Sequence, residues 1–180
     1  KRGMEGIIFD FLKNRVSLFQ YFTDNQITKI IDESRLLFCE QNEAVARFGE
    51  ENLFLGVVIE GELSASVIGE GGIRKEIRRF VTGDTFGEIA LMSQERMIAD
   101  IIAVKQSKVL QIPVIVFRTV IITEPKALQH VSKTVVERFS QMLETPDAAK
   151  SAFKQSADPY GLHLKGERPE KILVINSGSS

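Results

Sequence analysis

The chain has 180 residues, and its 23 lysines and arginines nearly balance 24 aspartates and glutamates, for a formal net charge of −1. This balance gives no overall attraction to nucleic acid or to anionic membranes, so we expect neither as a partner. A single cysteine excludes an internal disulfide, which suits a cytoplasmic protein, and the longest apolar run, 53–59, is far shorter than the roughly 20 residues of a membrane helix.

The first part of the chain, residues 1–35, is predicted to be helical. Apolar residues recur there at helical spacing in two blocks. Thr23 and Gln26 form a Thr-x-x-Gln capping box that predicts the start of the second helix. The chain does not begin with methionine, and we expect it to be a piece of a longer protein.

Residues 36–113 change to short runs rich in valine, isoleucine and phenylalanine, separated by glycine-containing turns. The expected strands lie at 53–60, 63–68, 73–81, 98–104 and 109–112. Gly61 and the glycines at 69, 71 and 72 mark hairpin turns, because glycine accepts the positive φ that these turns need. Many short strands at this spacing predict a fold that is mainly β with flanking α-helices, organised as a β jelly roll.

Residues 114–144 are predicted to form two helices. Pro113 ends the strands, one helix covers 114–122, and Pro125 opens a second helix that runs to about Leu143. The second helix carries an apolar stripe made of Leu128, Val131, Val135, Phe139 and Met142. Such a stripe needs a cover, from this chain or from a second copy in a homodimer.

The end of the chain divides into a linker, 145–170, and a short apolar strand that leads into a polar loop, 171–180. The last segment resembles the opening strand and phosphate loop of acetate kinases. The resemblance implies that Asn176, Ser179 and Ser180 belong to the phosphate loop of a kinase domain in cis, of which only the start is present. The alternative is an unrelated edge strand with a Gly/Ser tail, and we expect no catalytic residue in this chain itself.

One motif carries the prediction of a ligand site. Residues 86–91 read Phe-Gly-Glu-Ile-Ala-Leu, and residues 96–99 read Arg-Met-Ile-Ala. A carboxylate directly after a glycine, on a turn that leads into a short apolar helix, can direct an acceptor and free backbone N–H groups at one small ligand. The candidate ligand-binding residues are Phe86, Gly87, Glu88, Ile89, Ala90, Arg96, Met97, Ile98 and Ala99.

This segment resembles the phosphate-binding cassette of cyclic nucleotide-binding domains. The order of helices, jelly roll and two further helices over about 16–143 also resembles that family, as do the turn glycines Gly49, Gly61 and Gly83. The resemblance implies cAMP or cGMP as the ligand, no required cofactor and no metal, with Glu88 accepting a hydrogen bond from the ribose 2′-hydroxyl. It also implies that turn amides hold the cyclic phosphate and that a downstream arginine pairs with its charge.

Two registers are open for that arginine. The family spacing of about nine positions after Glu88 leads to Met97, so Arg96 stands one place early. Adjacent side chains of an extended segment face opposite ways, so an inward Met97 turns Arg96 to solvent. A loop shorter by one residue would instead turn Arg96 inward and place Met97 and Ile98 where the family has small residues.

Two further features have structural interpretations. The basic run Arg74, Lys75, Arg78 and Arg79 lies on a predicted strand, and we expect it to be a solvated face or an interdomain contact rather than a nucleotide site. His130 lies beside the apolar stripe, and we expect it to lie on the helix surface or to pack against a neighbouring helix.

The leading hypothesis is a regulatory cyclic nucleotide-binding domain fused in front of an acetate-kinase-like enzyme, in which the ligand shifts the helices of residues 114–143. The alternative is a degenerate domain that binds no nucleotide and serves as a dimerisation or docking module. A DNA-binding regulator of the catabolite-activator type is disfavoured, because a linker and an apolar strand follow the long helix instead of a helix-turn-helix.

Overall fold

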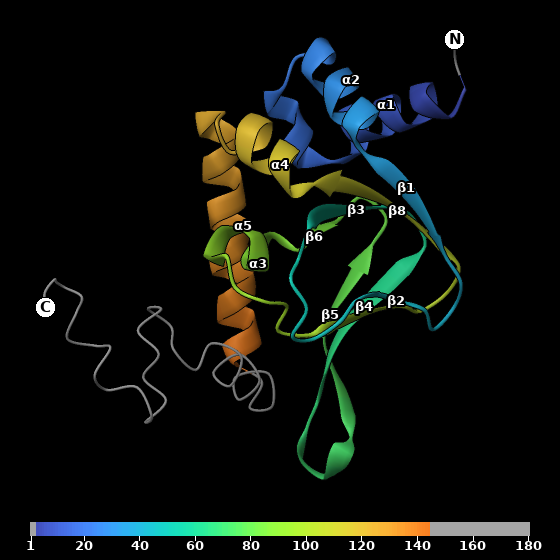
Figure 1. The fold of residues 1–180 in the computed structure, drawn as a ribbon, viewed down its shortest axis with the longest axis vertical. Helices are drawn as coiled ribbons and strands as arrows, with labels where there is room; N and C mark the ends of the chain where they lie inside the picture. The colour runs from blue at the N-terminus through green and yellow to red at the C-terminus, as the bar shows by residue number, and fades with distance from the viewer. Residues whose placement is uncertain (1–2, 145–180) are drawn as a thin grey trace, which may run out of the picture.

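The short apolar runs in the middle of the chain form two antiparallel four-stranded sheets, in a computed structural model that describes residues 3–144 (Figure 1). One sheet has the order β1-β8-β3-β6, from β1 (Arg35–Cys39), β8 (Ser107–Pro113), β3 (Phe54–Glu60) and β6 (Thr85–Phe86). The other has the order β2-β7-β4-β5, from β2 (Ala44–Ala46), β7 (Asp100–Ala103), β4 (Glu62–Ile68) and β5 (Arg74–Val81). The predicted fold class, a β jelly roll with flanking helices, is confirmed.

The N-terminal helices cover one end of the jelly roll (Figure 1). They are α1 (Met4–Arg15), the 3₁₀ turn η1 (Ser17–Tyr21) and α2 (Asp24–Glu33). The predicted capping box is present: the Gln26 amide donates to Thr23 Oγ1 at 3.2 Å, and the Thr23 amide donates to Gln26 Oε1 at 2.8 Å. A second 3₁₀ turn, η2 (Glu70–Gly72), forms the tip of the β4–β5 hairpin.

The C-terminal helices differ from the expectation of one regular helix over 114–122. A short α-helical turn, α4 (Val114–Val116), passes directly into a π-helical turn, η3 (Phe117–Ile121), which is closed by the Ile122 amide donating to the Phe117 carbonyl at 3.0 Å. This segment is rich in β-branched residues, which crowd a regular α-helix, and the wider turn relieves that crowding. The long helix α5 (Pro125–Leu143) then begins at the predicted proline.

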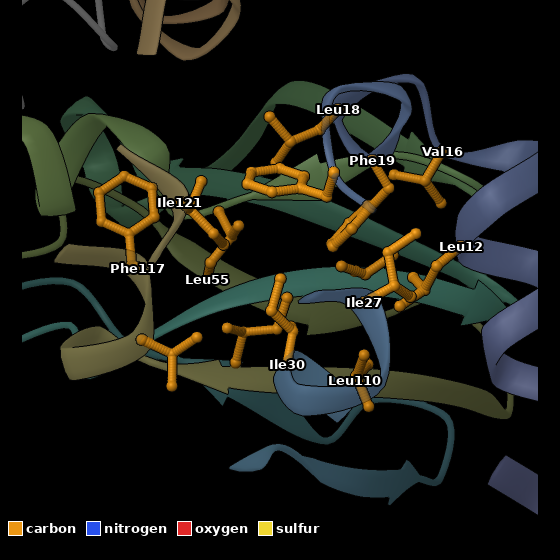
Figure 2. Close-up of a cluster of buried hydrophobic side chains, with 14 of the residues drawn as sticks. Leu12, Val16, Leu18, Phe19, Ile27, Ile30, Leu55, Leu110, Phe117 and Ile121 are labelled. Atoms are coloured by element: carbon orange, nitrogen blue, oxygen red, sulfur yellow. The ribbon is translucent and has the colours of Figure 1, made fainter. Parts of the chain in front are cut away.

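The apolar core has two parts. The first lies between the helices and the sheet that contains β3 and β8 (Figure 2). Its fully buried side chains include Leu12, Ile27, Ile30, Leu55, Ile112, Phe117 and Ile121. The second lies between the two sheets and includes Val58, Leu63, Phe80, Phe86, Met97, Ile101 and Val109. Four of the predicted ligand-binding residues, Phe86, Ala90, Met97 and Ala99, are therefore core residues as well.

Within residues 3–144, no helix combines the length and the apolar character that a membrane crossing requires.

Candidate functional site

The short helix α3 (Glu88–Ser93) begins directly after Gly87, a position that other residues do not occupy easily. Phe86 at the end of β6 lies against Gly56, where an added Cβ would come within 2.2 Å of the Phe86 ring. Gly87 follows with a φ of +95° and accepts a hydrogen bond at its carbonyl from Asn52 Nδ2 at 3.0 Å. The positive φ redirects the chain so that Glu88, the next residue, points inward.

Glu88 is almost completely buried, with 2% of its surface exposed, and both of its oxygens are engaged. Arg138 of α5 donates to Glu88 Oε1 at 2.7 Å and, from the same nitrogen, to the Thr85 carbonyl at 2.7 Å. The hydroxyl of Thr85 donates to Glu88 Oε2. Helix α5 therefore places a positive charge against the carboxylate that the sequence predicts as a ligand acceptor.

A cavity of about 80 Å³ lies beside this ion pair, between the jelly roll and α5. Among the predicted site residues, those that line it are Gly87, Glu88, Ile89, Ala90, Met97, Ile98 and Ala99. Phe86 lies beneath it in the core, and Arg96 does not line it. Ligand pockets commonly enclose roughly 300–1,000 Å³, so this cavity is small, and α5 forms one of its sides.

Arg96 does not have the position predicted for a phosphate ligand. Its side chain is exposed and donates to the Gly49 carbonyl at 3.2 Å, whereas Met97 is 6% exposed and lines the cavity. Two backbone hydrogen bonds fix this register: the Met97 amide donates to the Glu50 carbonyl at 2.9 Å, and the Gly49 amide donates to the Met97 carbonyl at 2.8 Å. Adjacent side chains of the paired segment face opposite ways, so Met97 turns inward and Arg96 outward.

The basic run on β5 divides between two environments. Arg79 lies on the surface and pairs with Glu62 and Glu76, and Arg74 pairs with Asp100, as expected for a solvated face. Arg78 instead lines the cavity, which contradicts the prediction for this residue. The reason is a β-bulge: Ala65 pairs with Arg78 but Ser66 pairs with Glu76. The extra residue disturbs the alternation, so that both Ile77 and Arg78 face the cavity.

The Arg78 guanidinium is incompletely satisfied. It lies over the Phe80 ring with its carbon 5.6 Å from the ring centroid, and Nη1 donates to Gln141 Oε1 of α5 at 2.8 Å. Its Nε is buried and has no hydrogen-bond partner among residues 3–144. Burial lowers the pKa of Arg78, and the positive charge of Arg138 adds to this effect, while Asp84 and Glu88 act in the opposite direction.

The face of α5 that closes the cavity carries Arg138, Gln141 and Met142. The predicted apolar stripe is only partly right, because Val131 and Met142 are buried while Leu128 and Phe139 remain 37% and 39% exposed. Sequence reasoning missed Arg138, although a signal was available. Arg138 lies seven positions after Val131 and four positions before Met142. At this helical spacing it is a charged residue on the buried face of the helix.

Other predicted features lie away from the cavity. His130 packs edge-on against Tyr21 with ring centroids 5.7 Å apart, as expected for a helix-packing residue. In the part of the chain described here, no three acidic, histidine or cysteine side chains converge on a common metal position. Asn176, Ser179 and Ser180, the predicted phosphate loop, lie outside the described residues.

Comparison with known proteins places this geometry in a family. Residues 36–124 match the family model described as the cyclic nucleotide-binding domain. A putative potassium channel protein of Rhodopseudomonas palustris, RPA4233, is 28% identical over 139 residues, which are 74% of this chain and 33% of that protein. The cGMP-dependent protein kinase egl-4 of Caenorhabditis briggsae is 35% identical over 104 residues, or 56% of this chain and 14% of the kinase.

Among solved structures, the regulatory domain of Toxoplasma gondii PKA, co-crystallised with cAMP, superposes with a TM-score of 0.66 at 25% identity. The match covers 74% of this chain and 50% of that one. The chain spans a third or less of the curated relatives described above. By its sequence over residues 36–124 and by its jelly roll, the domain described here belongs to the cyclic nucleotide-binding domain family.

Proposed function

We propose that this domain is a regulatory sensor that binds cAMP or cGMP between the jelly roll and α5. The observation that carries the proposal is the contact between Glu88 and Arg138, 2.7 Å apart. It links the carboxylate suited to a ribose hydroxyl directly to the helix that leads out of the domain. A ligand that engages Glu88 therefore competes with α5 for the same carboxylate.

The size of the cavity supports a ligand-driven movement. A volume of about 80 Å³ is small for a cyclic nucleotide, and Arg138, Gln141 and Met142 of α5 form part of its lining, so we expect binding to displace α5. The closed state is stabilised by the Glu88–Arg138 pair, and the open state is stabilised by the ligand. This difference in affinity between two states is what a regulatory domain requires.

The output of the sensor is proposed to be an enzyme domain in cis. The segment 171–180 resembles the start of an acetate kinase, and α5 is the last described element before it. The curated relatives support the general arrangement, since in a channel protein and in a protein kinase the matched region is a minor part of a longer chain. Movement of α5 would then be passed on through residues 145–170.

A second candidate function, a docking or dimerisation module without a nucleotide, is favoured by one observation. Met97 occupies the position at which the family arginine is expected, and Arg96 lies on the surface. In a dimerisation module, the exposed apolar residues of α5 would pack against a second copy of the chain. These residues are Leu128, Val136, Phe139 and Leu143.

Calorimetric titration of the chain with cAMP and with cGMP tests the sensor. We expect saturable binding, and we expect Glu88→Gln to weaken it by about 10-fold or more, because a hydrogen bond to a charged acceptor contributes roughly 1.5–3 kcal/mol. Glu51→Gln, a change at an exposed carboxylate, is the matched control and should leave the affinity unchanged. Absence of both heat and thermal shift at millimolar nucleotide, together with a dimer in light scattering, would favour the docking module.

A further inference from the structure

Arg78 and Arg138 both lie over the ring of Phe80, which lines the cavity. The guanidinium carbon of Arg78 lies 5.6 Å from the centroid of Phe80, and that of Arg138 lies 5.3 Å from the same centroid. They come from different elements, β5 and α5. Like charges held this close to one another are unfavourable unless acidic groups or a ligand compensate them.

The acidic groups nearby compensate only one of the two arginines by direct contact. Glu88 forms its ion pair with Arg138. Asp84 attracts Arg78 through space, but its Oδ2 accepts a hydrogen bond from the Val81 amide at 2.8 Å. The direct hydrogen-bond partner of Arg78 among the described residues is Gln141, which is neutral. Among residues 3–144, no acidic side chain is in contact with the Arg78 guanidinium.

The hydrogen-bonding capacity of the Arg78 guanidinium is only partly used by the residues around it. Nη1 is used by Gln141, and the buried Nε has no hydrogen-bond partner within residues 3–144. The Nε–H and the adjacent Nη2–H of a guanidinium are parallel, and such a pair of donors matches two oxygens of a phosphate or carboxylate. Ile77, Met97 and Met142 line the same cavity as Arg78, and their apolar side chains can contact the uncharged body of a ligand.

We propose that Arg78, on β5, binds the anionic group of the ligand and supplies the positive charge that Arg96 does not bring into the cavity. The ligand class is a compact oxyanion attached to an apolar or planar body. The inference rests on the proposed function to the extent that the oxyanion is the phosphodiester of a cyclic nucleotide. Because Arg138 lies over the same ring, it adds to the attraction once the ligand has separated it from Glu88.

Calorimetric titration with cAMP and cGMP tests this assignment with Arg78→Gln and a matched control on the same strand, Arg79→Gln. Arg79 is a surface arginine that is ion-paired with Glu62 and Glu76, so its loss should leave the affinity unchanged. We expect Arg78→Gln to weaken binding by about 10- to 100-fold and Arg78→Lys to recover part of that loss, because lysine keeps the charge but not the paired donors. Equal affinities for Arg78→Gln and wild type would overturn the assignment.

Thermal unfolding in sodium phosphate provides a readout that does not depend on a nucleotide, with sodium chloride at equal ionic strength as the reference. We expect phosphate to raise the melting temperature of wild type and of Arg79→Gln, and to leave that of Arg78→Gln unchanged. A phosphate effect without nucleotide binding would reject the cyclic nucleotide and retain the oxyanion site. Nucleotide binding that is insensitive to Arg78→Gln would retain the cyclic nucleotide as the ligand and reject the oxyanion site at Arg78. The absence of both effects rejects both proposals.

Discussion

Replacing Arg138 by alanine is the perturbation for which the structure predicts the largest effect. The change leaves Glu88 Oε1 without its partner in a site where the glutamate is 2% exposed, and it also removes the hydrogen bond to the Thr85 carbonyl. Breaking a buried ion pair by removing one partner costs about 3–5 kcal/mol, because the remaining charge is buried without compensation.

The lower part of that range is expected here. The side chain of Arg138 is itself 13% exposed, and the neighbouring cavity of about 80 Å³ can admit water to the orphaned carboxylate. We therefore expect Arg138→Ala to lower the free energy of unfolding by about 3 kcal/mol. This is a large share of the roughly 5–15 kcal/mol that stabilises a typical domain.

Urea denaturation followed by far-ultraviolet circular dichroism measures the change, with Arg118→Ala as the control. Arg118 lies exposed on η3, and its loss should change the free energy of unfolding by less than about 0.5 kcal/mol. Adding Glu88→Gln to Arg138→Ala removes the orphaned charge and should restore at least about 1 kcal/mol. A loss below about 1 kcal/mol for Arg138→Ala would refute the conclusion that α5 is held to the jelly roll by a buried ion pair.

Two further predictions concern the site and its surroundings. Gly87→Ala should lower the free energy of unfolding by about 1–3 kcal/mol, because the residue has a φ of +95° and its Cβ would lie 2.8 Å from Asn52 Nδ2; a melting temperature equal to that of wild type would contradict this. Burial alone would raise the pKa of Asp100, but hydrogen bonds from the Phe48 amide and from Arg74 outweigh it and lower that pKa below the ordinary value of 3.8. Since the folded-state pKa is depressed, this contribution to stability is present above pH 3.8 and is lost as the pH falls below it, so Asp100→Asn should reduce the acid dependence of the urea midpoint.

The parts of the fold that depend on local chemistry were predictable. The capping box at Thr23 forms as expected, because its two hydrogen bonds join residues only three positions apart. Gly61 and Gly83 have φ values of +101° and +95°, as their predicted turn positions require. Glu88 was identified from its glycine neighbour and lies in the cavity.

What the sequence left open, missed or predicted wrongly depends on pairing between distant segments. Whether Arg96 or Met97 faces inward was left open by the spacing and is decided by hydrogen bonds to Gly49 and Glu50, more than 40 positions earlier in the chain. The inward position of Arg78 depends on a bulge between β4 and β5, which alternation along one strand cannot reveal. The partner of Glu88 is Arg138, 50 positions away on another element.

The sequence by itself determined the fold class, the helix start at Thr23, the turn glycines and the place of Glu88 on a turn that leads into a short helix, because each follows from the conformational preferences of a few adjacent residues or from apolar periodicity. Only the tertiary structure decided which charges meet in the cavity. Packing of α5 against the jelly roll pairs Glu88 with Arg138, and within the described part of the chain it leaves Arg78 in contact with the neutral Gln141 only. Electrostatic contacts depend on distance in space, and distance along the chain says little about them.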